Sequence, residues 1–218
     1  MLYIVATPIG NLKDISLRAL EVLSSVDLIA CEDTRHTKIL LDHYGIKTHT
    51  TSFYQYNRIV KAEYLIKLLK EGKDIALVSD AGTPGILDPG YNLINLAIKN
   101  NIPITIIPGP TAFVNALVLS GKPTHEFVFL GFLPRKSSAR KNKLKKFLSQ
   151  GMTLVFYESS HRILATLEDL KELCPEKELV LVREITKRFE EIKRGKISEI
   201  KEYFKKNNVR RGEFVIVV

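Results

Sequence analysis

The chain has 218 residues, a net charge of +9 and 45% hydrophobic residues, enough apolar material for a sizeable core and too much for wholesale disorder. No apolar run approaches the roughly 20 residues that span a bilayer, and Met1–Ala6 is typical of a first strand and not of a signal peptide. Cys31 and Cys174 have no partners at metal-ligand spacing, so we expect no metal, no disulfide framework and a cytoplasmic protein.

The positive charge is confined to one half of the chain. Residues 1–112 carry equal numbers of acidic and basic side chains, so residues 113–218 carry the whole +9. This asymmetry indicates either that the second half binds a polyanion or that it has a lysine-rich, well-solvated surface. Charge alone does not separate these two interpretations.

The first half alternates strand-like and helix-like stretches, which predicts a five-stranded parallel sheet with helices on both faces. The predicted strands are Leu2–Thr7, Leu28–Cys31, Thr48–Phe53, Asp74–Ser79 and Ile102–Ile107. The predicted helices between them are Leu17–Val26, Thr34–Tyr44, Ile59–Leu69 and Tyr91–Lys99. Right-handed crossovers place the loops that follow these strands at one edge of the sheet.

Pro108-Gly109-Pro110-Thr111 marks the predicted domain boundary, which gives a parallel α/β domain over residues 1–112 and a mixed α/β domain over residues 113–218. The second half predicts strands at Phe127–Gly131, Thr153–Tyr157, Leu179–Glu184, Phe189–Arg194 and Glu213–Val218. Its predicted helices are Ala112–Leu119, Ser138–Leu148, Arg162–Leu173 and Ile197–Lys206. The last three elements favour antiparallel pairing, so the second sheet should be mixed.

Polar loops follow several predicted strands. Ser79–Gly90 is the longest of them, with three glycines, two prolines and two aspartates where a short turn would suffice. Thr7–Leu12 contains no dinucleotide fingerprint. Glu32, Asp33 and Arg35 follow the second strand, where Asp33 is also suited to cap the next helix. The ends of parallel strands are where α/β proteins bind ligands, so this edge is the candidate site.

The second half has similar clusters at its strand ends and one strongly basic stretch. The clusters are Gly131–Lys136, Tyr157–Arg162 and Arg183–Lys187. The basic stretch, Arg135–Lys146, contains no acid, which suits phosphate binding but equally suits a mobile solvated loop.

Together these motifs resemble the tetrapyrrole methylase superfamily, and within it the branch that methylates small-subunit ribosomal RNA. The residues that carry the resemblance are Thr7–Leu12, Cys31–Arg35, Ser79–Pro84, Asp88–Gly90, Pro108–Pro110, Gly131–Pro134, Glu158–Arg162, Arg183–Lys187 and Gly212–Phe214. The chain departs from the family pattern at Leu87, where Ser is usual, and at Ser160, where Pro is usual. It also ends near Val218, where many relatives carry a further extension.

The resemblance implies a two-domain fold with S-adenosylmethionine in the cleft between the domains, a homodimer, and 16S rRNA as substrate, methylated at a cytidine 2′-hydroxyl in the decoding centre. The implied cofactor contacts are Pro8, Asp80, Gly82, Thr83, Ile86, Thr111, Ala112, Tyr157 and Ile185. The expected RNA contacts are Arg135, Lys136, Arg140, Lys141, Arg162 and Lys187.

The expected catalytic residues are Glu32, Asp33, Arg35, Arg183 and Glu184. Methyl transfer to a hydroxyl is helped by a carboxylate that accepts its proton, and Glu32, Asp33, Asp80 and Glu184 are equal candidates for that base. Two other functions stay open: methylation of a tetrapyrrole, and RNA binding without catalysis in ribosome assembly. The loop Thr7–Asn11 lacks the Gly-x-Gly-Pro-Gly pattern usual in tetrapyrrole enzymes, and the basic second half suits RNA better.

Overall fold

The structure, a computed structural model, describes residues 1–54, 58–207 and 211–218. It divides into two compact units, Met1–Thr111 and Ala112–Val218, a division one residue before the predicted one. Among the described residues, no helix is both long and apolar enough to cross a membrane. The described residues also contain no group of three or more His, Cys, Asp and Glu side chains that could hold a metal ion.

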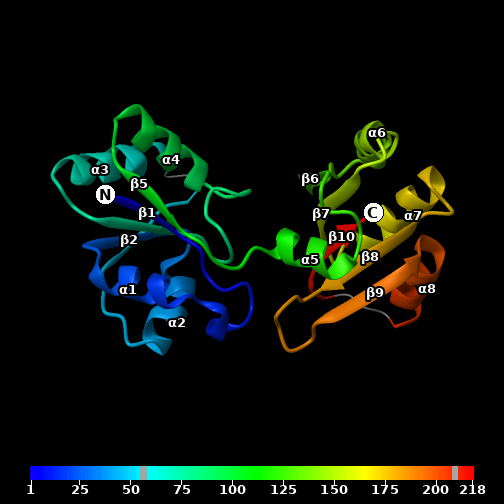
Figure 1. Ribbon diagram of the computed structural model, residues 1–218, viewed down its shortest axis with the longest axis horizontal. Helices are drawn as coiled ribbons and strands as arrows, with labels where there is room; N and C mark the ends of the chain where they lie inside the picture. Colours follow the sequence, from blue (N-terminus) through cyan, green and yellow to red (C-terminus); the bar gives the residue numbers. More distant parts are fainter. Residues whose placement is uncertain (55–57, 208–210) are drawn as a thin grey trace. The chain divides into compact units, whose positions relative to one another are not determined.

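The first unit is a parallel sheet with helices on both faces, as predicted (Figure 1). Its strands are β1 (Leu2–Val5), β2 (Leu28–Cys31), β3 (Thr50–Ser52), β4 (Ile75–Val78) and β5 (Ile104–Ile107), in the spatial order β3-β2-β4-β1-β5. Its helices are the short η1 (Leu12–Asp14), α1 (Leu17–Ser25), α2 (Thr34–His43), α3 (Arg58–Lys70) and α4 (Gly90–Lys99). The three central strands, β1, β2 and β4, are largely buried and therefore nearly continuously apolar, whereas the edge strands β3 and β5 are more exposed.

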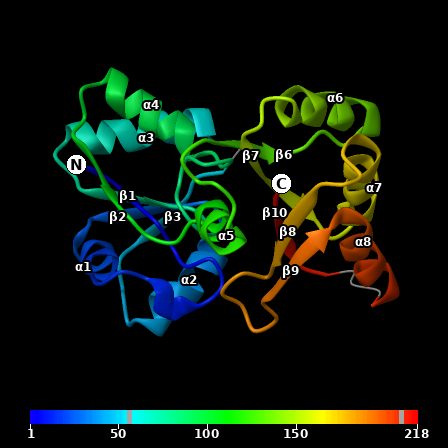
Figure 2. The same cartoon turned by 45° about the vertical axis from the view of Figure 1, so that its right-hand side comes forward.

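Two layers of apolar side chains enclose this sheet. Leu23 of α1 and Leu40 of α2 pack on one face, and Leu65 of α3 and Leu93 of α4 pack on the other. The turned view in Figure 2 shows α1 and α2 together on one side of the sheet and α3 and α4 on the other. The predicted first strand, Leu2–Thr7, ends instead at Val5, because Thr7 turns away to pair with Gly82.

The second unit is a mixed sheet in the order β6-β7-β10-β8-β9. Its strands are β6 (Phe127–Phe132), β7 (Thr153–Ser159), β8 (Glu178–Arg183), β9 (Glu191–Lys196) and β10 (Glu213–Val217). Only β6 and β7 are parallel; the other neighbouring pairs are antiparallel. The predicted α/β class, with one parallel and one mixed sheet, is thus confirmed.

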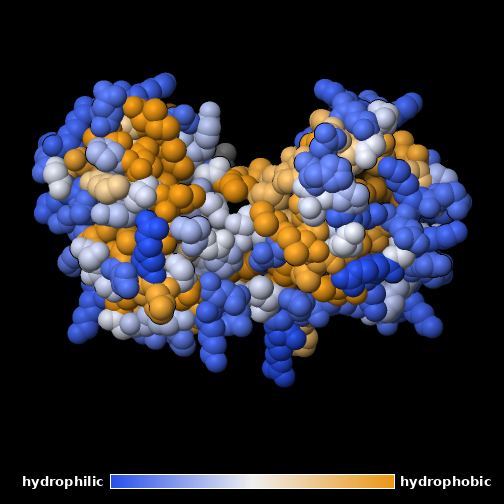
Figure 3. Space-filling model, viewed as in Figure 1, coloured by the Kyte–Doolittle hydropathy of each residue, from blue (hydrophilic) through white to orange (hydrophobic). Residues whose placement is uncertain are grey.

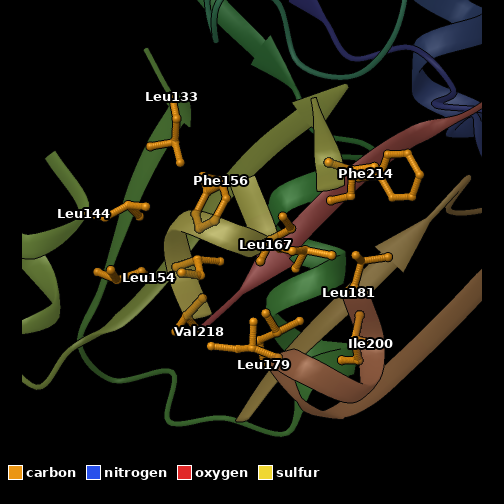
Figure 4. Close-up of a cluster of buried hydrophobic side chains, with 14 of the residues drawn as sticks. Leu133, Leu144, Leu154, Phe156, Leu167, Leu179, Leu181, Ile200, Phe214 and Val218 are labelled. Atoms are coloured by element: carbon orange, nitrogen blue, oxygen red, sulfur yellow. The ribbon is translucent and has the colours of Figure 1, made fainter. Parts of the chain in front are cut away.

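Helices cover both faces of this second sheet. They are α5 (Ala112–Ser120), α6 (Ser137–Leu148), α7 (Ile163–Leu173) and α8 (Ile197–Lys206). Leu144 of α6, Leu167 of α7 and Ile200 of α8 pack with Phe156 and Phe214 of the sheet in one core (Figure 4). On the opposite face α5 packs against β7 and β10, and Phe113 stacks on Phe129 with ring centroids 4.2 Å apart.

The helix predicted at Ser138–Leu148 is confirmed as α6, so the alternative interpretation of the basic stretch Arg135–Lys146 as a mobile loop is wrong. One expectation for the second unit was wrong in detail. The strand predicted at Phe189–Arg194 lies two residues later, at Glu191–Lys196. The reason is the turn before it, where Glu190 accepts a hydrogen bond from the Thr186 N–H at 2.6 Å and Glu184 and Thr186 both adopt positive φ.

Candidate active site

The site of the first unit lies where two neighbouring strands send their chains in opposite directions. From β1 the chain crosses through α1 to β2 on one side, and from β4 it crosses through α4 to β5 on the other. A parallel sheet opens a crevice at such a switch point, beyond the carboxyl ends of the strands. The loops after β1 and β4 therefore form the floor of the candidate site.

A pocket of about 180 Å³ occupies this position. It is lined by Thr7, Pro8, Gly10, Leu12, His36, Thr37, Ile39, Leu40, Ser79 and Asp80. Pro8 and Asp80 were predicted site residues, whereas the wall formed by α2 was missed. The available signal was the position of His36 and Thr37 in the first turn of the helix that directly follows the polar residues after β2.

Hydrogen bonds fasten the three strand-end loops to one another. Thr7 and Gly82 exchange two backbone hydrogen bonds of 2.9 and 3.0 Å, and the Thr7 hydroxyl donates to the Ser79 carbonyl oxygen at 3.1 Å. The Asp33 N–H donates to Asp80 Oδ1 at 3.1 Å. The structure thus brings together the loops that the sequence placed at one sheet edge.

The Ser79–Gly90 loop is held by a carboxylate within it. Asp88 Oδ1 accepts the N–H groups of Gly85 and Gly90 at 2.8 and 2.7 Å, and burial raises the pKa of Asp88 although both donors favour its charged form. A Cβ at Gly90 would lie 2.8 Å from Asp88 Oδ1, so this position requires glycine. Further along the same edge, Thr83 and Thr111 share a hydroxyl hydrogen bond of 2.7 Å.

Replacing Asp88 with alanine should destabilise the protein, because two backbone N–H groups lose their acceptor. We expect the free energy of unfolding to fall by about 1–3 kcal/mol in urea titrations. Asp42→Ala removes an exposed acid on α2 and should leave the unfolding free energy near that of the wild type. Equal losses in the two variants would contradict the assigned role of Asp88.

The acids after β2 differ in their surroundings. Asp33 caps α2 by accepting the Arg35 N–H at 2.8 Å, and its ion pair with the exposed Arg35 guanidinium lowers the Asp33 pKa to about 2. Glu32 is half-buried, and its pKa is raised by burial and then by the negative charges of Asp80, Asp88 and Asp33. Among these acids Glu32 is therefore the better proton acceptor near neutral pH.

In the second unit the predicted cluster after β8 is bonded within itself. Burial works to raise the pKa of Glu184, but hydrogen bonds from the Glu213 N–H at 2.9 Å and Lys187 Nζ at 3.1 Å lower it overall. Arg183 Nε donates to the Arg211 carbonyl oxygen at 3.0 Å, and Ile185 is buried. This cluster stabilises a turn, and its charges are largely satisfied internally.

The remaining predicted residues of the second unit take several positions. Ala112 begins α5, and the Tyr157 hydroxyl accepts the Phe113 N–H at 3.3 Å; burial raises the Tyr157 pKa. Lys141 pairs with Glu172 at 2.6 Å. Arg140 was expected to bind RNA, but it is buried and paired with Asp169, so we remove it from the contact surface as a correction.

Comparison with known proteins agrees with the motif resemblance, and the similar relatives cover the whole chain. The family model of the tetrapyrrole (corrin/porphyrin) methylases matches residues 1–201. Ribosomal RNA small subunit methyltransferase I of Hydrogenobaculum sp. is 49% identical over 218 residues, which cover all of this chain and 94% of the relative. The enzyme of that name from Escherichia coli O157:H7 is 48% identical over 219 residues, covering all of this chain and 77% of the relative.

Solved structures agree at the level of the fold. Diphthine synthase superposes with a TM-score of 0.75 at 16% identity, covering 100% of this chain and 88% of that one. Uroporphyrin-III C-methyltransferase from Thermus thermophilus, complexed with S-adenosylhomocysteine, superposes with a TM-score of 0.68 at 17% identity, covering 99% of this chain and 96% of that one. The resemblance seen in the motifs is confirmed: this chain belongs to the tetrapyrrole methylase family, in the branch of ribosomal RNA small subunit methyltransferase I.

Proposed function

We propose that this protein is an S-adenosylmethionine-dependent methyltransferase of small-subunit ribosomal RNA, and that it methylates the 2′-oxygen of a cytidine ribose in 16S rRNA. The observation that carries the proposal is the 49% identity, over the whole chain, to an enzyme named for methylating that RNA. The 2′-oxygen and the cytidine rest on the motif resemblance. Such an enzyme works where ribosomal subunits lie, in the cytoplasm.

The first unit suits this cofactor electrostatically. After burial, the negative charges of Asp80, Asp88 and Asp33 are the causes that raise the pKa of Glu32, so the edge of the sheet carries a negative potential that complements a cationic sulfonium. We assign Gly82, Thr83, Ile86 and Thr111 to cofactor binding, with Pro8 and Asp80 at the border of the pocket. When bound, S-adenosylmethionine supplies an electrophilic methyl group.

The protein contributes position and proton transfer. Holding the acceptor oxygen in line for displacement accounts for much of the rate, because it removes the entropic cost of the encounter. Glu32 accepts the proton of the ribose hydroxyl as the oxygen attacks, and its raised pKa makes it a stronger base than Asp33 or Glu184. Arg35 pairs with Asp33, but its side chain is 90% exposed, so its guanidinium can exchange that carboxylate for an RNA phosphate.

The test is incubation with tritiated S-adenosylmethionine and small ribosomal subunits that lack this modification. We expect label in a cytidine ribose, recovered after alkaline hydrolysis as a dinucleotide because 2′-O-methylation blocks cleavage. Large ribosomal subunits in equal amounts are the control. Label on a base, or label in both kinds of subunit, would contradict the proposal.

We further propose that the enzyme is a homodimer. In support, α5 is apolar nearly all round, and Val118 and Val114 are 68% and 42% exposed. A sedimentation mass of one chain at micromolar concentration would contradict this.

A further inference from the structure

Two arginines hold the loop between β6 and α6 by its backbone. Arg162 Nη2 donates to the carbonyl oxygens of Leu133 and Pro134 at 2.7 and 3.3 Å. Arg140 Nη1 donates to those of Pro134 and Arg135 at 3.5 and 3.1 Å. Three successive carbonyl groups thus accept hydrogen bonds from guanidinium groups. The Leu133 side chain anchors the same loop in the apolar core (Figure 4).

A buried carboxylate fixes each of these arginines. Arg140 Nε donates to Asp169 Oδ2 at 2.6 Å, and the two residues are 3% and 4% exposed. Arg162 Nε lies 3.2 Å from Oε1 of Glu158, a residue that is 2% exposed. Oε2 of Glu158 also accepts a hydrogen bond from the Thr166 hydroxyl at 2.6 Å. Guanidinium groups held at several points have little freedom left, so they define the position of the loop.

The neighbouring cations Arg135 and Lys136 behave differently. Both are exposed, and neither side chain forms an ion pair within the part of the chain that the structure describes. The surface over α6 is hydrophilic (Figure 3), but two of its lysines are engaged, Lys141 with Glu172 and Lys143 with the Leu130 carbonyl oxygen. Arg135 and Lys136 are therefore unneutralised charges on a fixed backbone.

We propose that residues 133–136 form a preorganised loop for binding RNA phosphates, in which Arg135 and Lys136 make the contacts. Arg140 and Arg162 were both expected to contact RNA, but here they are positioning residues that bind the loop and not the RNA. Fixing the loop before binding reduces the ordering cost that flexible lysines and arginines otherwise incur. The inference rests on the proposed function, because it takes ribosomal RNA as the ligand.

The test compares three variants in binding to 16S rRNA across a range of salt concentrations. Arg135→Ala/Lys136→Ala removes the two proposed phosphate contacts. The slope of log K against log salt concentration should therefore become less steep by roughly 1.4–1.8, the value for two phosphates. Arg140→Met/Asp169→Leu replaces the buried pair by apolar residues without changing the net charge, an exchange that proteins often tolerate. We expect it to weaken binding toward the level of the first variant, with S-adenosylmethionine affinity unchanged.

Combining all four substitutions gives the decisive comparison. If Arg140 acts only through the loop, the combined variant binds RNA no more weakly than Arg135→Ala/Lys136→Ala. A further, additive loss of affinity, or wild-type binding by Arg140→Met/Asp169→Leu, would overturn the inference. Should that variant fail to fold, Arg162→Lys serves instead, because an ammonium keeps the charge beside Glu158 but cannot span the carboxylate and two carbonyl groups.

These outcomes are distinct from a failure of the proposed function. That failure would appear as a wild-type protein that transfers no methyl group to small subunits. The inference about the loop fails only through the binding behaviour of the variants.

Discussion

Glu32→Gln should lower the rate of methyl transfer by about 10²- to 10⁴-fold, the usual contribution of a general base. Glutamine keeps the shape of the side chain and cannot accept the proton. The wild-type rate should rise with pH through a pKa above the ordinary glutamate value, because burial and then the charges of Asp80, Asp88 and Asp33 raise the pKa of Glu32. Single-turnover rates measured over a series of pH values give both the rate loss and its pH dependence. In Glu32→Gln the fall in rate at low pH should be absent.

Stability separates this role from a structural one. A carboxyl group whose folded-state pKa is raised favours the folded state less once it ionises, so removing the charge should not lower the unfolding free energy at pH 7. Asp33→Ala is the matched control, since it removes the cap of α2 and should reduce stability more than turnover. Normal turnover in Glu32→Gln, or a rate loss matched by unfolding, would remove Glu32 from the mechanism.

Asp169→Ala should be the most destabilising single change in the second unit. It leaves the Arg140 guanidinium buried without its counter-charge, at a cost of about 3–5 kcal/mol. Urea unfolding monitored by circular dichroism measures the loss. Glu172→Ala provides the control, because it breaks the more exposed ion pair with Lys141 and should change stability little. If the two variants lost similar amounts of unfolding free energy, burial would not determine how much these ion pairs contribute to stability.

The strands and helices could be predicted well from the sequence, because each depends on a local periodic pattern of apolar residues. Leu28–Cys31 and Ile197–Lys206 coincide with β2 and α8, and most other ends differ by one or two residues. The edge of the first sheet was also predictable, since parallel strands end on one side. Ranking Glu32 above Asp33 was not predictable, because it depends on how closely Arg35 and Asp80 approach them in space.

The arginines show why the candidate site was harder to predict. Arg135 and Arg140 belong to one basic run, yet one is exposed and the other is buried. Arg140 lies one helical turn before the buried Leu144, so it shares the apolar face of α6, and that spacing was a usable signal. Its partner Asp169 is 29 residues away in the chain, and the pairing depends on tertiary packing.

The order of strands in the first unit has a consequence for synthesis on the ribosome. The first strand to be made, β1, lies between β4 and β5, and the Thr7 hydroxyl bonds to a carbonyl group 72 residues later. The emerging chain therefore leaves β1 without a strand partner until Ile75–Val78 has left the exit tunnel, and the second edge of β1 stays unpaired until Ile104–Ile107 follows. Contacts this distant in sequence form slowly, so Leu2–Val5 is an exposed apolar segment that a chaperone could bind during translation.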